Sequence, residues 1–180
     1  MKRFKASYFQ AKDIPVKVSW MNDIRINEHM YFSLPATEEA TMKWFTENKD
    51  NVNRVDFTFK ENEKYIAMGG FTGINHQSGI AEFYVMVNPE MQGKGIGRKV
   101  SLWMYNYAFV KLQLNKIFLY TDNSNIPSSK IYEKAGFQQE GLLRQHKLKN
   151  GILRDRRVYG LLREEWEEKE WRLKQVYYDF

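Results

Sequence analysis

The sequence contains no cysteine among its 180 residues. Disulfide frameworks, zinc sites built on thiolates and a cysteine nucleophile are therefore all excluded. Proline is scarce as well, with 4 residues, and the 11 glycines do not gather into a linker. Because nothing marks a domain boundary and the length suits one domain with a sizeable core, we expect residues 1–180 to form a single domain.

Long apolar runs are also missing. No segment approaches the roughly 20 consecutive apolar residues that a membrane span needs. The basic start "MKRFKASYFQ" has no apolar segment behind it, as a signal peptide would have. We therefore expect a cytoplasmic protein with no membrane contact.

The charge balance favours anionic partners. Lysine and arginine together number 28 against 22 aspartates and glutamates, a formal net charge of +6. A modest positive balance suits nucleotides, coenzymes that carry phosphate, or nucleic acid, and it selects none of them.

Alternating apolar residues between short polar turns predict a series of strands. The first three strands are expected to form an antiparallel meander in the first half of the chain. A fourth strand and a closing hairpin follow the meander. The predicted strands are residues 53–60, 64–74, 79–87 and 116–122, and the hairpin is residues 137–162 with a turn at Asn150-Gly151.

Helical spacing of apolar residues alternates with these strands. Residues 13–50 are expected to be helix and loop, with Thr37 as an N-cap. Further helices are predicted at 96–112, at 125–135 with Gly136 as its C-cap, and in the charged segment at about 162–176. The fold class is therefore α+β, with a mixed, mostly antiparallel central sheet flanked by helices.

The segment "NPEMQGKGIG", residues 88–97, places three glycines at alternate positions between a predicted strand and a predicted helix. Such a loop binds phosphate, because backbone N–H groups and the helix dipole converge there. The string G-x-x-x-x-G-K-[ST] of a P-loop does not occur. A dinucleotide-binding G-x-G-x-x-G would need glycine where Arg98 stands.

The spacing that does fit is Q-x-x-G-x-G, from Gln92 to Gly97, and it resembles the acyl-CoA pyrophosphate loop of the GNAT acetyltransferases. "YEKAGF" at 132–137 and the glycine-containing hairpin around Asn150-Gly151 follow in the order found in that family. Over about residues 13–166, the chain is similar to the branch that contains ribosomal-protein alanine acetyltransferases and spermidine acetyltransferases.

This resemblance implies the GNAT acyl-CoA N-acyltransferase fold and an enzyme. The implied reaction moves an acetyl group from acetyl-CoA, the co-substrate, to a primary amine by direct attack on the thioester. The backbone of the strand before the loop would pair with the pantetheine arm, and the loop would hold the pyrophosphate. The implied coenzyme-binding residues are Val85, Met86, Val87, Gln92, Gly93, Lys94, Gly95, Ile96, Gly97, Arg98 and Asn125.

Two residues take catalytic roles by the same resemblance. Tyr132 would protonate the departing thiolate, and the alternative is that its ring only packs beneath Phe137. Glu82 would act as the base, directly or through a water, and the alternative is a solvent-facing strand residue. Asn125 would either bind the coenzyme arm or only cap its helix. The three histidines share no ligand spacing, so no metal site is expected.

The acceptor is the open question. The hairpin segment 142–157 is basic, which disfavours a polyamine and suits an acceptor that carries phosphate, unless these charges only face solvent. We expect a small-molecule acceptor such as a nucleotide-linked amino sugar. The alternatives are a ribosomal-protein or peptide N-terminus, a polyamine, or a non-catalytic protein that binds acyl-CoA.

The sequence bears on two kinds of partner besides the acceptor. Nucleic acid is not expected, because its binding would leave the glycine loop without a role. The C-terminal helix, with Trp166, Leu173 and Val176 along one side, would either pack onto its own domain or form a homodimer contact.

Overall fold

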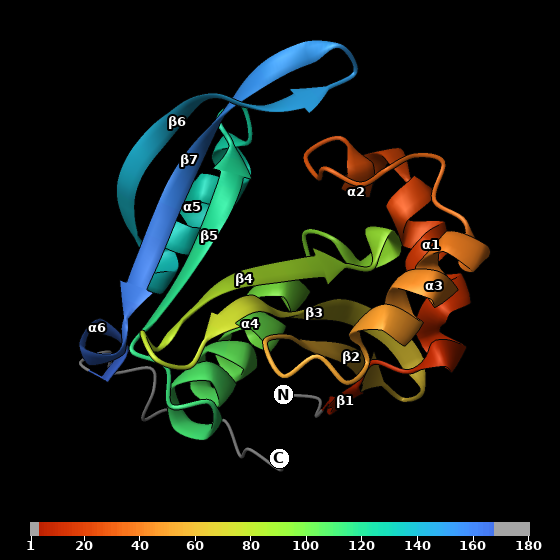
Figure 1. The fold of residues 1–180 in the computed structure, drawn as a ribbon, viewed down its shortest axis with the longest axis horizontal. Helices are drawn as coiled ribbons and strands as arrows, with labels where there is room; N and C mark the ends of the chain where they lie inside the picture. Colours follow the sequence, from red (N-terminus) through yellow and green to blue (C-terminus); the bar gives the residue numbers. More distant parts are fainter. Residues whose placement is uncertain (1–3, 168–180) are drawn as a thin grey trace. The chain divides into compact units, whose positions relative to one another are not determined.

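The computed structural model describes residues 4–167 of the chain (Figure 1). Two compact units make up the fold. Of the described residues, the first contains 4–74 and 83–102, and the second contains 75–82 and 103–167. The chain passes from one unit to the other after Ile74, after Glu82 and after Leu102.

Seven strands of the described residues form one sheet in the order β1-β2-β3-β4-β5-β7-β6. The pairs β1–β2, β2–β3, β5–β7 and β6–β7 are antiparallel, and β4–β5 is parallel. The α+β prediction with a mixed, mostly antiparallel sheet is confirmed. The strands are β1 (Lys5–Tyr8), β2 (Val55–Glu61), β3 (Lys64–Asn75), β4 (Ile80–Val87), β5 (Lys116–Asp122), β6 (Gln138–Lys149) and β7 (Ile152–Leu162).

Strand β1 was not predicted, because its four residues have no clear apolar alternation. It pairs with β2, where Ala6 lies opposite Phe59. Long-range pairing with β2 therefore orders a segment whose own sequence is uninformative.

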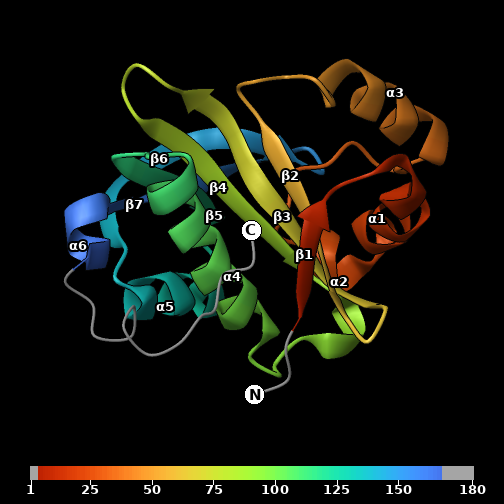
Figure 2. The ribbon, with the colours of Figure 1, turned by 90° about the horizontal axis from the view of Figure 1, so that it is seen from below.

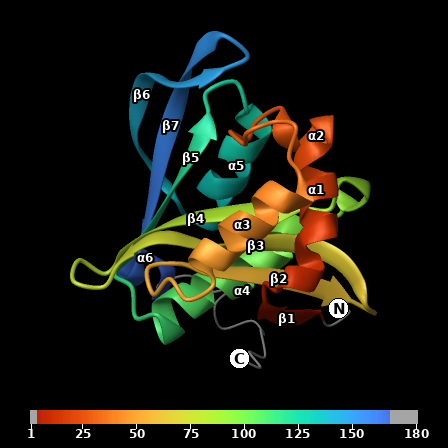
Figure 3. The same cartoon turned by 45° about the vertical axis from the view of Figure 1, so that its right-hand side comes forward.

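Helices cover the strands of the first unit on one side. These are α1 (Ile14–Asn22), α2 (Ile24–Asn27) and α3 (Glu38–Asn48), and Figures 2 and 3 show α1 and α3 beside β2 and β3. Phe9 packs edge-on against Trp44 and Phe45 of α3, at ring-centroid distances of 6.0 and 5.9 Å. The predicted N-cap is confirmed: the Ala40 N–H donates to the Thr37 hydroxyl at 3.1 Å.

The second unit has an aromatic core. Helix α4 (Ile96–Asn106) continues through a π-helical turn (Tyr107–Lys111), and α6 (Arg163–Glu167) returns to it. Trp166 of α6 is buried and packs against Tyr105 and Phe109 at 5.8 and 5.9 Å. Trp166 thus packs within its own unit, whereas the rest of the helix predicted to reach residue 176, including Leu173 and Val176, lies outside the described residues. None of the helices in residues 4–167 is long and apolar enough to cross a membrane.

Two predicted turn glycines take the expected conformations. Gly136 ends α5 (Ile126–Ala135) with a φ of 100°, and the Phe137 ring folds back to within 5.7 Å of Tyr132. Asn150 and Gly151 both have positive φ, 50° and 75°, as a two-residue type I′ hairpin turn requires. Both turns are therefore confirmed.

Candidate functional site

The glycine loop opens a backbone surface to solvent. Gly93 and Gly95 have φ values of 73° and 76°, and a Cβ atom built on either would meet no other atom within 4 Å. A side chain would therefore project into open space, and the left-handed backbone there is one that glycine adopts without strain. The glycines thus keep free the volume that a phosphate needs to reach the backbone.

Gly97 has a different reason to be glycine. A Cβ atom at this position would lie 3.3 Å from Val87 Cγ2, which is tighter than an ordinary contact. The missing side chain lets the first turn of α4 approach the end of β4. The N–H groups of that turn then follow directly on from the loop, and most have no acceptor inside the helix.

Local charge at the loop favours an anion. The side chains of Lys94 and Arg98 are exposed beside the loop. The Lys94 ammonium donates to the Glu90 carbonyl at 3.0 Å, and the Glu90 carboxylate pairs with Arg25 at 2.7 Å. The negative charge of Glu90 is therefore neutralised by Arg25. The helix dipole and Lys94 leave the loop with a positive potential. Loop and helix start together suit a pyrophosphate.

The strand that leads into the loop includes three more predicted binding residues. Met86 is buried, whereas Val85 and Val87 are half-buried on β4. Directly after them, Asn88 donates its side-chain amide to the Tyr65 carbonyl at 2.8 Å and accepts from the Glu90 N–H at 2.9 Å. These two bonds fix where the strand ends and the loop begins. Pairing of this backbone with a pantetheine arm stays a prediction.

Tyr132 lies on α5 in the second unit. Burial raises the pKa of its hydroxyl, and a hydrogen bond with Ser128 acts in the opposite direction. The phenol therefore carries its proton at neutral pH, as a general acid must. The ring also contacts Phe137, so packing and a catalytic role are compatible.

Asn125 is the N-cap of α5, since its side-chain oxygen accepts from the Ser128 N–H at 3.1 Å. The helix cap is therefore present, and it does not decide whether Asn125 also contacts the coenzyme. This bond uses only the oxygen, so the amide nitrogen stays suited to a coenzyme contact, which remains a prediction.

Glu82 is half-buried on β4, with Phe118 of β5 as its partner in the parallel register. Its neighbours Ala81 and Phe83 are buried, so the strand alternation turns the carboxylate to the other face of the sheet. Its role as the base remains a prediction.

The predicted site residues therefore form two groups. The structure brings Val85–Val87 and Gln92–Arg98 together at one end of β4 in the first unit. Asn125 and Tyr132 share α5, which with Glu82 belongs to the second unit. Within the described part of the chain, no three His, Asp or Glu side chains form a group that could hold a metal ion.

The first unit also contains a partly buried polar cluster that was not predicted from the sequence. The Arg54 guanidinium donates to both oxygens of Asp56, at 2.7 and 2.9 Å, and the Tyr84 hydroxyl donates to the same carboxylate. Burial, and then the charge of Asp56, raise the pKa of Tyr84 well above its ordinary value. The Lys17 ammonium lies 3.7 Å from the ring centre of Trp44. An aspartate inside the apolar run "VDFTF" was the signal that could have revealed this cluster.

Lys17 is expected to make the stability of the protein depend on pH. Burial lowers its pKa from 10.5 to about 8, against the attraction of Asp56. Below pH 8 the lysine is charged in both states, so the folded state bears the cost of burial; above pH 10.5 it is neutral in both. We expect the free energy of unfolding to rise by about 2 to 3 kcal/mol between these pH values.

Urea unfolding across this range should show the rise in the wild type and in the exposed-lysine control Lys12→Met, but not in Lys17→Met. Parallel curves for the wild type and Lys17→Met would contradict the assignment.

Comparison with known proteins bears on the loop and the fold. A family model described as "Acetyltransferase (GNAT) domain" matches residues 3–138. The spermidine N(1)-acetyltransferase of Vibrio cholerae is 32% identical over 135 residues, which are 74% of this chain and 76% of that protein. YdaF of Bacillus subtilis, a proposed ribosomal N-acetyltransferase, is 34% identical over 87 residues, 48% of each chain. This chain covers between 44% and 96% of the length of the curated relatives. For several of them it covers less than two thirds.

Solved structures extend the comparison. The crystal structure of a Vibrio cholerae spermidine N-acetyltransferase in complex with CoA and spermine matches with a TM-score of 0.83. The match covers 92% of this chain and 98% of that one, at 22% identity. At such low identity, the likeness supports the fold alone.

Proposed function

Because the chain belongs to the GNAT acetyltransferase family, we propose that it transfers the acetyl group of acetyl-CoA to a primary amine. The observation that carries this proposal is the glycine loop. Gly93 and Gly95 leave open space over a backbone in the left-handed conformation, and Gly97 brings the start of α4 to the end of β4. This arrangement supports binding of the coenzyme pyrophosphate through backbone N–H groups.

The proposed chemistry needs few side chains. The backbone of Val85 to Val87 would hold the pantetheine arm and polarise the thioester carbonyl. The amine nitrogen attacks the carbonyl carbon, and the bond from carbon to sulfur then breaks. Glu82 would accept the amine proton, directly or through a water, and Tyr132 would give its proton to the thiolate. The raised pKa of Tyr132 supports its role, since the proton is present at neutral pH.

We further propose that both units act as one acetyltransferase domain. The matched family model runs from residue 3 to residue 138 and so takes in parts of both units.

A small-molecule primary amine is the proposed acceptor. The Vibrio cholerae relative is named for spermidine, so a polyamine is the first candidate. The relatives reported above give no support to an amino-sugar acceptor. The basic hairpin favours an acceptor with negative charge, and YdaF keeps a ribosomal or peptide acceptor as the alternative.

The first test is a thermal melt with acetyl-CoA, CoA and ATP. A ligand at about 100 times its Kd stabilises by about 2.7 kcal/mol, which raises the Tm of a domain of this size by roughly 5 to 11 °C. We expect a shift of this order with both CoA species and none with ATP. The absence of a shift at millimolar acetyl-CoA would refute the proposal.

An amine panel then separates an enzyme from a silent binder. Release of free CoA thiol is measured with spermidine, spermine, amino-sugar nucleotides and N-terminal peptides. Acetyl-CoA binding without turnover on any amine would favour a non-catalytic acyl-CoA-binding protein.

A further inference from the structure

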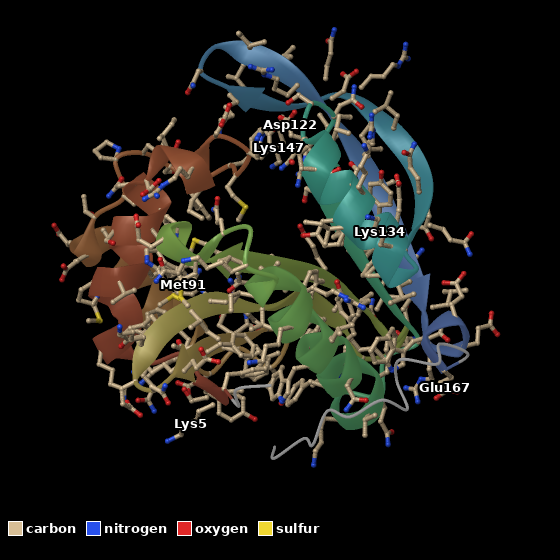
Figure 4. All side chains as sticks on the ribbon, turned by 180° about the vertical axis from the view of Figure 1, so that it is seen from behind. Lys5, Met91, Asp122, Lys134, Lys147 and Glu167 are labelled. Atoms are coloured by element: carbon tan, nitrogen blue, oxygen red, sulfur yellow. The ribbon has the colours of Figure 1, made fainter. Side chains whose placement is uncertain are left out.

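In the second unit, one face of β5, β7 and β6 carries aromatic and cationic side chains. Helix α5 lies on the opposite face, behind β5 and β7 in Figure 1 and in front of them in Figure 4. The Tyr159 hydroxyl, on that α5 side, donates to Glu133 of α5 at 3.0 Å. Because side chains alternate along a strand, Arg154 and Arg156 point away from α5. We call this side of the three strands the cationic face.

The register places its members next to one another. Lys147 of β6 lies opposite Arg154 of β7, and Tyr120 of β5 lies opposite Val158, two residues along from Arg156. The Arg156 guanidinium lies 4.5 Å from the centre of the Tyr120 ring, and the His146 ring lies 5.5 Å from it. The register of β6 is irregular between Leu143 and Lys147, so strict alternation does not separate His146 from Lys147. The cationic face therefore consists of Tyr120, His146, Lys147, Arg154 and Arg156.

Positive charge on this face exceeds the negative charge near it. The pKa of His146 is lowered by desolvation and then by the charges of Arg156 and Lys147. Asp122 lies opposite Arg156 and also accepts from the Ser124 hydroxyl at 2.6 Å. Asp155 alternates onto the α5 side of β7, where its carboxylate accepts from the Gln145 N–H at 2.8 Å. One carboxylate thus stands among three permanent cations.

Among the described residues, Arg154 has a buried hydrogen-bond donor that lacks an acceptor. Its Nε atom is buried and makes no hydrogen bond within residues 4–167, and in the same part of the chain Arg154 forms no ion pair. A buried guanidinium N–H without an acceptor is costly, so such groups are normally satisfied by a ligand, water or ion. Guanidinium forks match the geometry of phosphate oxygens, and a neighbouring aromatic ring offers a stacking surface.

We propose that the cationic face binds a phosphate group carried by the amine acceptor, with Arg154 and Lys147 as its ligands and Tyr120 beside the attached organic moiety. The inference rests on the proposed acetyl transfer and narrows the acceptor to an anionic amine. The pyrophosphate of the coenzyme is proposed to bind at the glycine loop in the first unit. The coenzyme pyrophosphate therefore does not explain the cations of the cationic face. This inference departs from the polyamine that the Vibrio cholerae relative suggests, because a polyamine would meet like charge on the cationic face.

The test is calorimetric titration of UDP, as a phosphate-bearing probe, into the full chain saturated with acetyl-CoA. Saturation keeps the glycine loop from binding the probe. We expect one UDP per chain, weakened about 10-fold in Arg154→Gln and in Lys147→Gln, because each loses a charge-assisted hydrogen bond. Lys134→Gln is the matched control, since Lys134 is exposed on α5 (Figure 4) and should bind UDP like the wild type. Circular dichroism checks that each variant is folded.

The outcomes separate this inference from the proposed function. Failure of the wild type to bind UDP while it binds acetyl-CoA would overturn the anion site and leave acetyl transfer standing. An equal loss of UDP affinity in Lys134→Gln would overturn it too, because the effect would then be one of overall charge. If acetyl-CoA does not bind, acetyl transfer fails, and UDP titrated alone into the Arg154 and Lys147 variants still decides whether the cationic face holds phosphate.

Discussion

Replacing Gly93 and Gly95 together by valine is expected to raise the Kd for acetyl-CoA by about 100-fold. Both residues have φ above 70°, and a β-branched residue in that region is strained by about 1 to 3 kcal/mol. The loop would therefore leave its present backbone, and the new side chains would project into the space that the pyrophosphate needs. Fluorescence or calorimetric titration with acetyl-CoA measures the change directly.

The control for this prediction is Gly73→Val. Gly73 lies on β3 in the same unit, has a φ of 60°, and also has no atom within 4 Å of a built Cβ. It should impose a similar strain without changing coenzyme affinity. If the control weakens acetyl-CoA as much as the loop variant does, general destabilisation explains both, and the loop loses its assigned role.

The second large effect is expected from Tyr132→Phe, which should lower kcat by about 100-fold with little change in KM. The phenylalanine keeps the ring contact with Phe137 at 5.7 Å, so the C-terminal end of α5 should remain packed. The substitution removes the proton for the departing thiolate and the hydrogen bond with Ser128. Since burial raises the pKa of this hydroxyl, kcat of the wild type should not fall through ionisation of Tyr132 until the pH exceeds the ordinary tyrosine value of 10.0.

Tyr159→Phe serves as the comparison. Its hydroxyl also lies in the second unit and donates to Glu133, yet no catalytic role is assigned to it. We expect a modest loss of stability with kcat unchanged. Should Tyr132→Phe retain full kcat, Tyr132 would be a packing residue only, and the proton would have to come from another donor or from water.

Much of the fold was predictable because its signals are local. The cap at Thr37, the left-handed Gly136 and the Asn150-Gly151 turn each depend on a few adjacent residues, and each is confirmed. Strand β1 was missed because its order comes from pairing with β2, a partner some fifty positions later in the chain. For single residues the sequence predicted only alternative roles. Asn125, for example, could be predicted to cap its helix or to bind the coenzyme arm, and the structure shows the cap.

The sequence by itself determined the family, because the glycine loop is contiguous and its backbone demands can be read from adjacent residues. It also located the basic hairpin, but a list of charges does not say which of them share a face. Only the tertiary structure gathered Arg156 and His146 around Tyr120, and only it buried Lys17 against Trp44 beside the Arg54–Asp56 pair. Strand register and helix packing decide those neighbours, and both are set by contacts between residues far apart in the chain.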